Sequence, residues 1–481
     1  MEKVFTKYFL FYDYETFGLN PALDRIAQFS CIRTDLKFKI IKKYKVLYCI
    51  PPIDYLPNPE SVIITGITPQ ITFSKFGYIE HIFAKKIFNI FKKNNTCILG
   101  YNNINFDDEM TRHLFYRNFF DPYEWSWKNN NSRWDIINII RAIFVLRPDG
   151  IKWPKDKVGN LIFKLNKVTK ENKIIHLNAH DASSDVNACI ELMKLLKDKK
   201  QKILDFLFFY KTKKNILFLI KNTKINSFVY VSSFFGSEKK FMSIISIIFF
   251  HPENRNIIIF FDLSKNFSIL LNFLKNVKMD KWTLEVFFSL GINFIYINRS
   301  PVLVPQSFLR NIDYLRLKID KEKYYLNFRN LNNHIFFLKK KLLNFFLEEK
   351  NFFKNKNPKY KSFNVDESLY DSFFSFSEKR AINLIQSSSS YEELKKIKFE
   401  SKRINDLFFN FRGRNYPETL SEDEKLIWKN KCKNSISPIV LFEYRKKIIF
   451  LLKKYQNDNR ICLLLNDLLK YIIFIKNKIF K

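Results

Sequence analysis

The pattern of apolar residues changes twice along this chain of 481 residues, and these changes limit what it can fold into. Over roughly the first 195 residues, strand-like runs such as 8–12 and 97–101 alternate with helical stretches, a mixture typical of α/β or α+β domains. The lysine-rich run 197–202 follows an amphipathic helical stretch. We therefore predict an α/β domain over residues 1–196.

The rest of the chain divides again. Residues 201–356 contain the short β-type runs SFVYVSS, MSIISIIFF, IIIFFDL and NFIYIN, with turn formers at 251–256. The basic, proline-containing stretch 351–363 is typical of a linker. Beyond it, apolar residues recur at three- and four-residue spacing in 439–455 and 462–479. We predict a small β-rich domain over 201–356 and a helical C-terminal domain over 359–481.

Composition narrows the possible functions. Lys and Arg number 82 against 47 Asp and Glu, and the net charge of +35 favours a polyanionic partner, nucleic acid before an anionic membrane surface. Codon bias is an alternative explanation of the size of this charge, because Lys, Asn, Ile and Phe all have AT-rich codons. No run approaches the roughly 20 apolar residues of a membrane span, and no signal-peptide pattern opens the chain. Six cysteines without a CxxC pair indicate reduced thiols in a cytoplasmic protein.

The sharpest local feature is a pair of carboxylates at the end of the apolar run YFLFY. Asp13 and Glu15 point to one face if the strand continues, because side chains alternate with a period of two. Two carboxylates on one face repel each other unless a cation lies between them, and Mg²⁺ or Mn²⁺ prefers such oxygen ligands. By itself the DxE pattern is better explained by a solvated turn, because with 47 acidic residues in the chain such a pair is expected by accident.

Two further acidic segments strengthen the interpretation. Asp107 and Asp108 stand where an apolar strand gives way to a helix, although helix capping also explains aspartates there. Asp185 opens another helix, and His180 precedes it by five residues in a chain with only six histidines.

Taken in order, DxE, NxxxFD (102–107) and HxxxxD (180–185) resemble the motifs of the DEDD exonuclease superfamily, in its histidine-bearing DEDDh branch. The segments YDYETFGLNPALDRIAQF, ITGITPQ, CILGYNNINFDDEMTRHLFYRNFFDPYEWSW, HPENRN and FNFRGRNYPETL further resemble the exodeoxyribonuclease I family. The resemblance is dense through the first 195 residues and patchier afterwards. It implies an RNase H-like exonuclease domain, an SH3-like β domain and a helical C-terminal domain.

The resemblance also implies roles for the site residues. Asp13, Glu15 and Asp185 would hold one of two Mg²⁺ ions, for which Mn²⁺ is a substitute, and Asp107 would support the second ion. The NxxxFD spacing favours Asp107 over Asp108 as the fourth carboxylate. His180 would accept the proton of the attacking water, a task that an imidazole with an ordinary pKa near ~6.5 suits.

The segment 112–141 interleaves cations with aromatic residues, as non-specific binding of single strands requires. Trp134 is the member that we assign to the core. Beside Glu15, the family resemblance indicates these DNA contacts: Arg112, Tyr123, Trp127, Arg141, Lys164, Lys213 and Asn256. At position 164 the family tends to carry arginine. Lys164 keeps the positive charge, but it cannot form the pair of parallel hydrogen bonds that an arginine side chain donates to a phosphate.

We therefore predict a Mg²⁺-dependent 3′→5′ exonuclease that degrades single-stranded DNA to nucleoside 5′-monophosphates in DNA repair and recombination. The alternatives are a catalytically silent single-strand-binding protein and an RNA-trimming relative. The expected partners are single-stranded DNA and, through its acidic C-terminal tail, single-stranded DNA-binding protein. A cytoplasmic monomer is expected, with no membrane partner.

Overall fold

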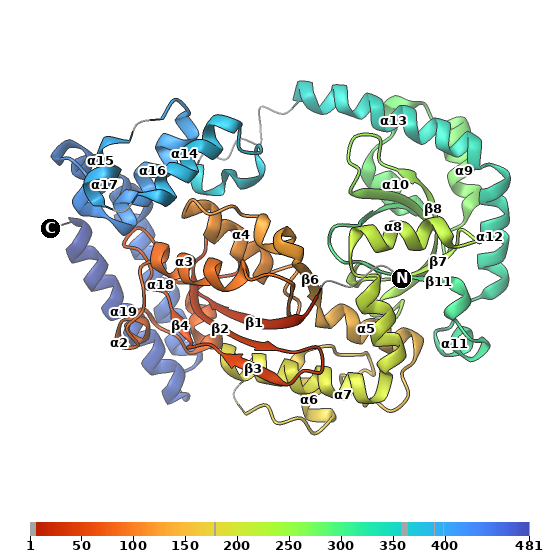
Figure 1. Cartoon of the computed structure of the whole chain (residues 1–481), viewed down its shortest axis with the longest axis horizontal. Helices are drawn as coiled ribbons and strands as arrows, with labels where there is room; N and C mark the ends of the chain where they lie inside the picture. Colours follow the sequence, from red (N-terminus) through yellow and green to blue (C-terminus); the bar gives the residue numbers. More distant parts are fainter. Residues whose placement is uncertain (1–5, 178, 357–363, 389, 398, 481) are drawn as a thin grey trace. The chain divides into compact units, whose positions relative to one another are not determined.

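The structure is a computed structural model of the chain (Figure 1). It describes residues 6–177, 179–356, 364–388, 390–397 and 399–480. The described chain forms two compact units. The first unit comprises residues 6–132, 176–187 and 364–480, and the second comprises 133–175 and 188–356.

The first unit is built on a sheet that begins at the run YFLFY. The strand β1 (Tyr8–Thr16) pairs antiparallel with β2 (Ile26–Thr34) and parallel with β5 (Thr96–Gly100). The short strands β3 (Ile40–Lys43) and β4 (Leu47–Tyr48) both pair with β2. The predicted strand thus continues through the DxE motif, as the apolar run indicated.

Helices cover one face of this sheet. The side chains of Leu10, Tyr12 and Tyr14 on β1 are buried in one cluster with residues of α3 (Glu80–Phe91) and α4 (Asp107–Arg117). Because successive side chains of a strand point to opposite faces, Asp13 and Glu15 project from the other face. The apolar alternation of β1 therefore sets the direction of both carboxylates.

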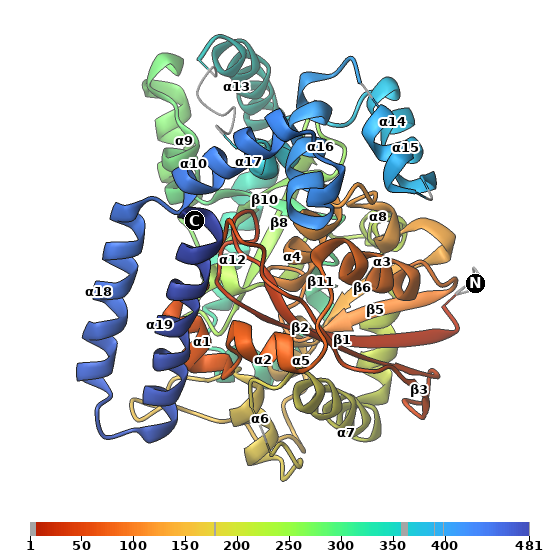
Figure 2. The ribbon, with the colours of Figure 1, turned by 90° about the vertical axis from the view of Figure 1, so that its left-hand side faces the viewer.

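Helices from the end of the chain complete the first unit (Figures 1 and 2). Phe17, Val62 and Ile67 share a buried cluster with residues of α18 (Pro438–Lys454) and α19 (Asn459–Phe480), which lie side by side. The predicted helical patterns at 439–455 and 462–479 are confirmed. The other helices of this unit are α1 (Pro59–Thr65), α2 (Pro69–Ser74), α14 (Phe376–Ser387), α15 (Tyr391–Lys396), α16 (Lys402–Asn415) and α17 (Glu422–Ser435), with one-turn helices η1 (Glu124–Ser126), η2 (Lys128–Asn130), η6 (Val365–Tyr370) and η7 (Pro417–Thr419).

The second unit contains an antiparallel sheet of five strands in the order β10-β9-β8-β7-β11. Its strands are β7 (Phe228–Val231), β8 (Met242–Phe250), β9 (Ile257–Asp262), β10 (Ile292–Tyr296) and β11 (Val302–Pro305). The first four are the β-type runs of the sequence. Ile216 and Leu219 of α8 (Lys213–Asn222) pack against the inner face of this sheet.

The second unit holds more helix than the sequence pattern indicated. Its helices are α5 (Ile136–Leu146), α6 (Leu165–Glu171), α9 (Phe267–Asn276), α10 (Leu284–Leu290), α11 (Asn311–Arg316), α12 (Lys321–Asn333) and α13 (Ile335–Lys356), with one-turn helices η3 (Ser233–Phe235), η4 (Met279–Lys281) and η5 (Gln306–Phe308). A short strand, β6 (Ser132–Asp135), precedes α5. The predicted linker begins inside α13, and its residues 357–363 lie outside the described residues.

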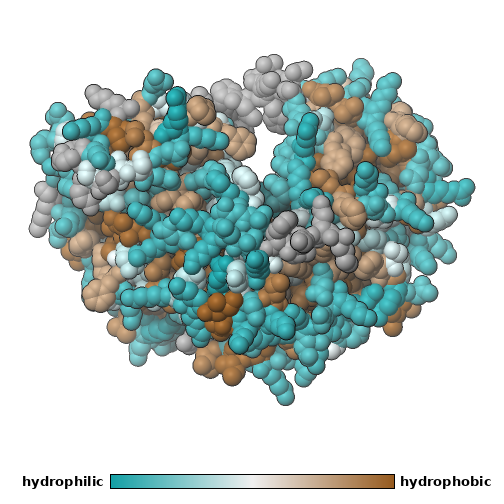
Figure 3. Space-filling view, in the orientation of Figure 1, coloured by the Kyte–Doolittle hydropathy of each residue, from teal (hydrophilic) through white to brown (hydrophobic). Residues whose placement is uncertain are grey.

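The helix α7 (Ala182–Phe209) runs through the lysine-rich stretch 197–202, with a non-helical backbone at Lys200. All six cysteines are free thiols, and five of them are buried. Hydrophilic residues cover most of the face drawn in Figure 3, as the high content of charged residues requires. Among the described helices, none is long and apolar enough to cross a membrane.

Candidate active site

The far end of β1 presents two acidic side chains. Glu15 is 6% exposed, and Asp13 is half-buried. Tyr14, between them, points to the helix-covered face, where its hydroxyl lies 3.0 Å from the Thr111 hydroxyl of α4. The predicted placement of both carboxylates on one face is therefore confirmed.

Hydrogen bonds to Gln28 hold the start of α7 at the same end of the sheet. This residue faces Glu15 across the β1–β2 pair. Its side-chain oxygen accepts a hydrogen bond from the backbone N–H of Ala182 (3.0 Å), and its amide nitrogen lies 3.3 Å from an Asp181 carboxylate oxygen. Gln28 therefore places the first turn of α7, which contains Asp185, next to Glu15.

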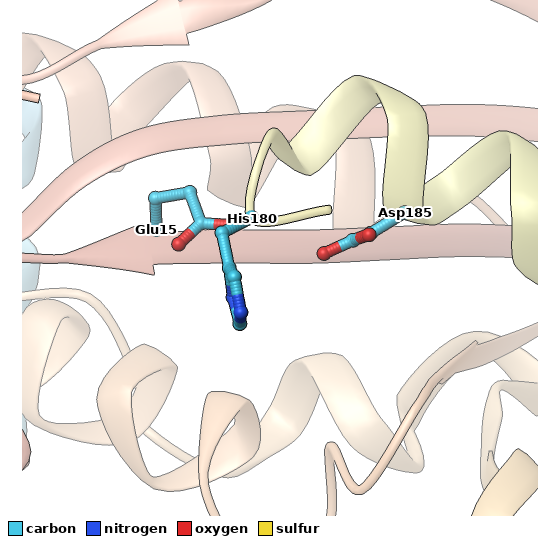
Figure 4. Close-up of side chains that lie close together, drawn as sticks. All are labelled: Glu15, His180 and Asp185. Carbon is cyan, nitrogen blue, oxygen red and sulfur yellow. The ribbon is translucent and has the colours of Figure 1, made fainter. Parts of the chain in front are cut away.

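Three potential ligand groups meet at this point. Each of Glu15, His180 and Asp185 offers one potential metal-ligand atom, and these three atoms all lie within 4.8 Å of one another (Figure 4). They come from β1, from the segment before α7 and from the first turn of α7. His180 is exposed and has a left-handed backbone (φ 66°), a strained conformation for a residue other than glycine. The structure thus brings together three of the five predicted catalytic groups.

The electrostatics of the cluster favour a bound cation. Burial, together with repulsion from Asp107 and Glu15, raises the pKa of Asp13 well above its ordinary value. Burial and repulsion from Asp185 raise the pKa of Glu15 to about 9. Burial also raises the pKa of Asp185. A divalent ion would relieve this repulsion, so the donor set fits a divalent metal.

His176 is a neighbour of this cluster that the sequence analysis did not single out. Its Nε2 lies 2.5 Å from Oδ1 of Asp185, and the two side chains are 4% and 15% exposed. A second histidine four residues before His180, in a chain with only six, was the available signal. Gln28 carried no comparable signal, because its role depends on the pairing of β1 with β2.

The structure distinguishes Asp107 from Asp108. Asp108 is fully buried, and its Oδ1 accepts hydrogen bonds from the Tyr12 hydroxyl (2.6 Å) and the Asn103 amide (3.1 Å). Asp107 accepts a long hydrogen bond from the backbone N–H of Tyr14 (3.3 Å) and repels Asp13 and Glu15 electrostatically. Neither side chain caps α4. Asp107 therefore belongs to the acidic cluster, whereas the hydrogen bonds to Asp108 stabilise the turn before the helix.

Besides Glu15, three of the predicted DNA contacts lie in the first unit: Arg112, Tyr123 and Trp127. The Arg112 side chain is mostly buried, pairs with Glu109 and lies 5.7 Å from the centre of the Tyr123 ring. Trp127 is 63% exposed. By contrast, Trp134 is buried, as predicted for a core residue.

The other candidates lie in the second unit. Lys213, at the start of α8, donates a hydrogen bond to the side-chain oxygen of Asn256 in the turn between β8 and β9 (2.6 Å). These two residues, predicted separately, thus form one polar site. The guanidinium group of Arg141 lies 5.1 Å from the centre of the Phe241 ring. Lys164 is exposed just before α6.

Carboxylates from a sheet strand and a neighbouring helix, next to an exposed histidine, fit the sites of the class of enzymes that hydrolyse phosphodiester bonds with divalent metals. Comparison with known proteins agrees. Residues 10–193 match the family model "Exonuclease", 211–348 the "Exonuclease I SH3-like domain" and 363–475 the "Exonuclease I C-terminal domain".

Similar proteins cover nearly the whole chain. Exodeoxyribonuclease I of Buchnera aphidicola subsp. Schizaphis graminum is 47% identical over 98% of this chain and 96% of its own length. The crystal structure of Escherichia coli exonuclease I in complex with a dA16 oligonucleotide has a TM-score of 0.89 and 38% identity, and covers 98% of this chain and 100% of its own. A structure of single-stranded DNA-binding protein (SSB) with exonuclease I and an inhibitor gives the same TM-score and coverage.

The chain belongs to the exodeoxyribonuclease I family. It is a hydrolase that acts on phosphodiester bonds, with an RNase H-like exonuclease domain, an SH3-like domain and a helical C-terminal domain. The predicted fold class is therefore confirmed. The first unit joins the sheet of the exonuclease domain to the C-terminal helices, which lie more than 240 residues apart in the sequence.

Proposed function

We propose that this protein is a Mg²⁺-dependent 3′→5′ exonuclease that degrades single-stranded DNA to nucleoside 5′-monophosphates. The observation that carries the proposal is the convergence of Glu15, His180 and Asp185 within 4.8 Å. The family membership and a related structure with a single-stranded oligonucleotide support the choice of substrate.

Glu15 and Asp185, with Asp13, are the residues that would hold one ion, and Asp107 would support a second. The buried, mutually repelling carboxylates and their oxygen-rich donor set favour Mg²⁺, with Mn²⁺ as a substitute. Bound divalent ions would lower the pKa of water and neutralise charge on the scissile phosphate.

His180 serves as the general base in this proposal. Its exposed ring lies among the carboxylates, and it can accept a proton from water and release it to solvent. Hydrogen bonds of Gln28 and Asp181 hold the start of α7, directly after His180, next to Glu15.

The path of the strand follows the cations and aromatic rings already described. Arg112 and Tyr123 stand together on the first unit, with Trp127 close in sequence. Arg141, Lys164, Lys213 and Asn256 would contribute from the second unit. Arginine and lysine neutralise phosphates and aromatic rings stack on bases, and neither contact depends on the base sequence.

The expected interaction with the acidic tail of SSB has a suitable site in the second unit. The lining of a cavity of about 720 Å³ includes four cationic side chains, one carboxylate and an aromatic ring: Arg147, Lys199, Lys200, Lys202, Asp205 and Phe308. Cations beside an aromatic ring suit an acidic peptide with an apolar end. We further propose that the protein is a cytoplasmic monomer that acts in DNA repair and recombination. The six free thiols agree with a reducing compartment.

The test uses single-stranded DNA, duplex DNA and single-stranded RNA, each labelled at the 5′ or the 3′ end. With Mg²⁺, label at the 3′ end of single-stranded DNA should appear at once as mononucleotide, while 5′ label stays in shortening strands. EDTA and the substitution Asp13→Ala should both stop digestion. Binding without digestion would indicate the silent single-strand-binding protein, and preference for RNA would indicate an RNA-trimming enzyme.

A further inference from the structure

A turn of the SH3-like domain is fixed to the sheet of its own domain. Residues 236–241 connect η3 to β8, and Lys239 in this turn forms an ion pair with the buried Asp262 of β9 (3.0 Å). The Lys239 ammonium group also donates a hydrogen bond to the Ser264 hydroxyl (2.7 Å). The turn therefore has a defined position within the second unit.

The end of this turn carries the half-buried side chain of Phe241. The N–H of Phe241 donates a hydrogen bond to the carbonyl oxygen of Gly236 (2.8 Å), and its carbonyl oxygen accepts one from the N–H of Ser232 (2.8 Å). Lys240 and Phe241 both have left-handed backbones (φ 54° and 60°), a strained conformation for residues other than glycine. Such strain persists only where the surrounding structure compensates for it, and it often marks a functional position.

The Phe241 ring contacts two residues of the exonuclease segment in the same unit. It lies edge-on to Phe163, with centroids 5.2 Å apart and an interplanar angle of 74°. The guanidinium group of Arg141, on α5, lies 5.1 Å from the centre of the Phe241 ring and 6.0 Å from that of Phe163. Phe163 and Arg141 are 7% and 8% exposed. Two rings, one from each domain, thus hold one arginine.

We propose that Phe241 is a positioning residue for strand binding, whose ring holds the Arg141 guanidinium group in the orientation that contacts a phosphate of the single strand. This inference rests on the proposed function, in which Arg141 is a DNA contact. A carboxylate partner would neutralise an arginine and occupy its N–H donors. An aromatic ring restrains the side chain by a cation–π contact and leaves those donors available for a phosphate.

The restraint favours binding for an entropic reason. A long side chain that is already held in place loses less conformational freedom when it contacts a phosphate, so more of the interaction contributes to affinity. Phe241 lies within the residues that match the SH3-like domain, and Arg141 within those that match the exonuclease domain. The SH3-like domain thus acts on strand binding through a residue of its neighbour.

The test measures equilibrium binding of a labelled single strand to full-length protein carrying Asp13→Ala, which keeps the DNA intact. Phe241→Leu keeps an apolar side chain but removes the aromatic face, and should weaken binding roughly 3- to 30-fold. Phe241→Tyr keeps the face and should bind within about twofold of the parent protein. Phe288→Ala, which removes a 36% exposed ring elsewhere in the SH3-like domain, should have no effect.

A double-mutant cycle shows whether Phe241 acts through Arg141. Arg141→Gln should weaken binding and lower the salt dependence by about 0.7 in the slope of log affinity against log salt, the contribution of one phosphate contact in a single strand. Adding Phe241→Leu to Arg141→Gln should cause no further loss. Lys213, whose partner Asn256 follows the other end of β8, gives the matched comparison. The fold-losses of Lys213→Gln and Phe241→Leu should multiply.

The outcomes separate this inference from the proposed function. The same loss from Phe241→Leu with and without Arg141 would overturn the inference and leave the proposed function intact. It would also be overturned if Phe241→Tyr bound as weakly as Phe241→Leu, or if Arg141→Gln bound like the parent. A parent protein that binds no single-stranded DNA would overturn the proposed function itself.

Discussion

Nε2 of His176 lies 2.5 Å from Oδ1 of Asp185, the carboxylate that shares a cluster with Glu15 and His180. Both side chains are largely buried, so the contact fixes the orientation of the Asp185 carboxylate. Hydrogen bonds of this kind to a metal-binding carboxylate orient it and adjust its affinity for the ion.

His176→Ala should therefore raise the Mg²⁺ concentration needed for half-maximal activity by about 10- to 100-fold. The maximal rate at saturating Mg²⁺ should fall much less. His176→Gln, which can still hydrogen-bond to Asp185, should recover part of the affinity. Activity titrated with Mg²⁺ gives both quantities, and an unchanged half-activation point would assign His176 a purely structural role.

The fourth carboxylate can be identified by comparing two neighbouring substitutions. Asp107→Asn should reduce the rate of digestion by at least about 100-fold while the melting temperature stays near that of the wild type, because the substitution relieves the repulsion of Asp13 and Glu15 by Asp107. Asp108→Asn should lower the melting temperature, because Asp108 accepts hydrogen bonds from buried Tyr12 and Asn103. The opposite pattern in rate and melting temperature would assign the fourth position to Asp108.

Local sequence predicted the elements that carry the chemistry. The alternation in YFLFYDYE is enough to place Asp13 and Glu15 on one face, since strand geometry has a period of two. The helix expected to open at Asp185 is likewise present: Val186, Cys189 and Ile190, at helical spacing, form the buried face of α7, with Asp185 in its first turn. These are properties of single elements, which short-range patterns express.

Contacts between distant segments could not be predicted in this way. Gln28 reaches the start of α7 only because β2 pairs with β1 in one register. The sequence around Gln28 does not predict that register. The ion pair of Asp366 with Arg25 likewise joins segments several hundred residues apart. The helices of residues 311–356 were missed because the β-type runs before them dominated the pattern of that region.

The role of His180 can be separated into proton transfer and metal binding. His180→Ala should lower kcat by about 10²–10⁴, the usual contribution of a general base. The defect should shrink as pH rises, because hydroxide becomes available as the nucleophile. Single-turnover rates between about pH 7 and 9.5 measure this trend. A large shift in the Mg²⁺ half-activation point, with no dependence on pH, would show that His180 acts mainly as a ligand.

The repulsion among the active-site carboxylates should cost stability when no metal is bound. At about pH 9.5, above the pKa of about 9 that Glu15 has without metal, Glu15→Gln removes one buried charge and should raise the melting temperature in EDTA by a few degrees. Adding Mg²⁺ should stabilise the wild type and have little effect on the variant. Glu422→Gln, at an 89% exposed side chain, is the matched control and should change neither value. A lower melting temperature for Glu15→Gln in EDTA would show that the cluster does not repel itself in this way.

The buried charges around Asp366 should stabilise the first unit and make its stability depend on pH. Burial alone would raise the pKa of Asp366, but Arg414 and Arg25 hold it below its ordinary value. Arg414 also pairs with Asp54 and Arg25 with Glu80. Asp366→Asn removes one negative charge from this buried cluster, leaves a positive charge uncompensated, and should lower the free energy of unfolding by about 3–5 kcal/mol at pH 7.

The sign of the pH dependence follows from the direction of this shift. A carboxyl group with a lowered native pKa stabilises the fold above its unfolded pKa of about 4, and this stabilisation is lost as pH falls further. The difference in unfolding free energy between wild type and Asp366→Asn should therefore be constant from about pH 7 to 5 and shrink below pH 4. Urea unfolding at each pH measures it, with Asp423→Asn as an exposed control. A difference that grew toward low pH would mean that Asp366 is protonated in the native protein and is not the partner of the two arginines.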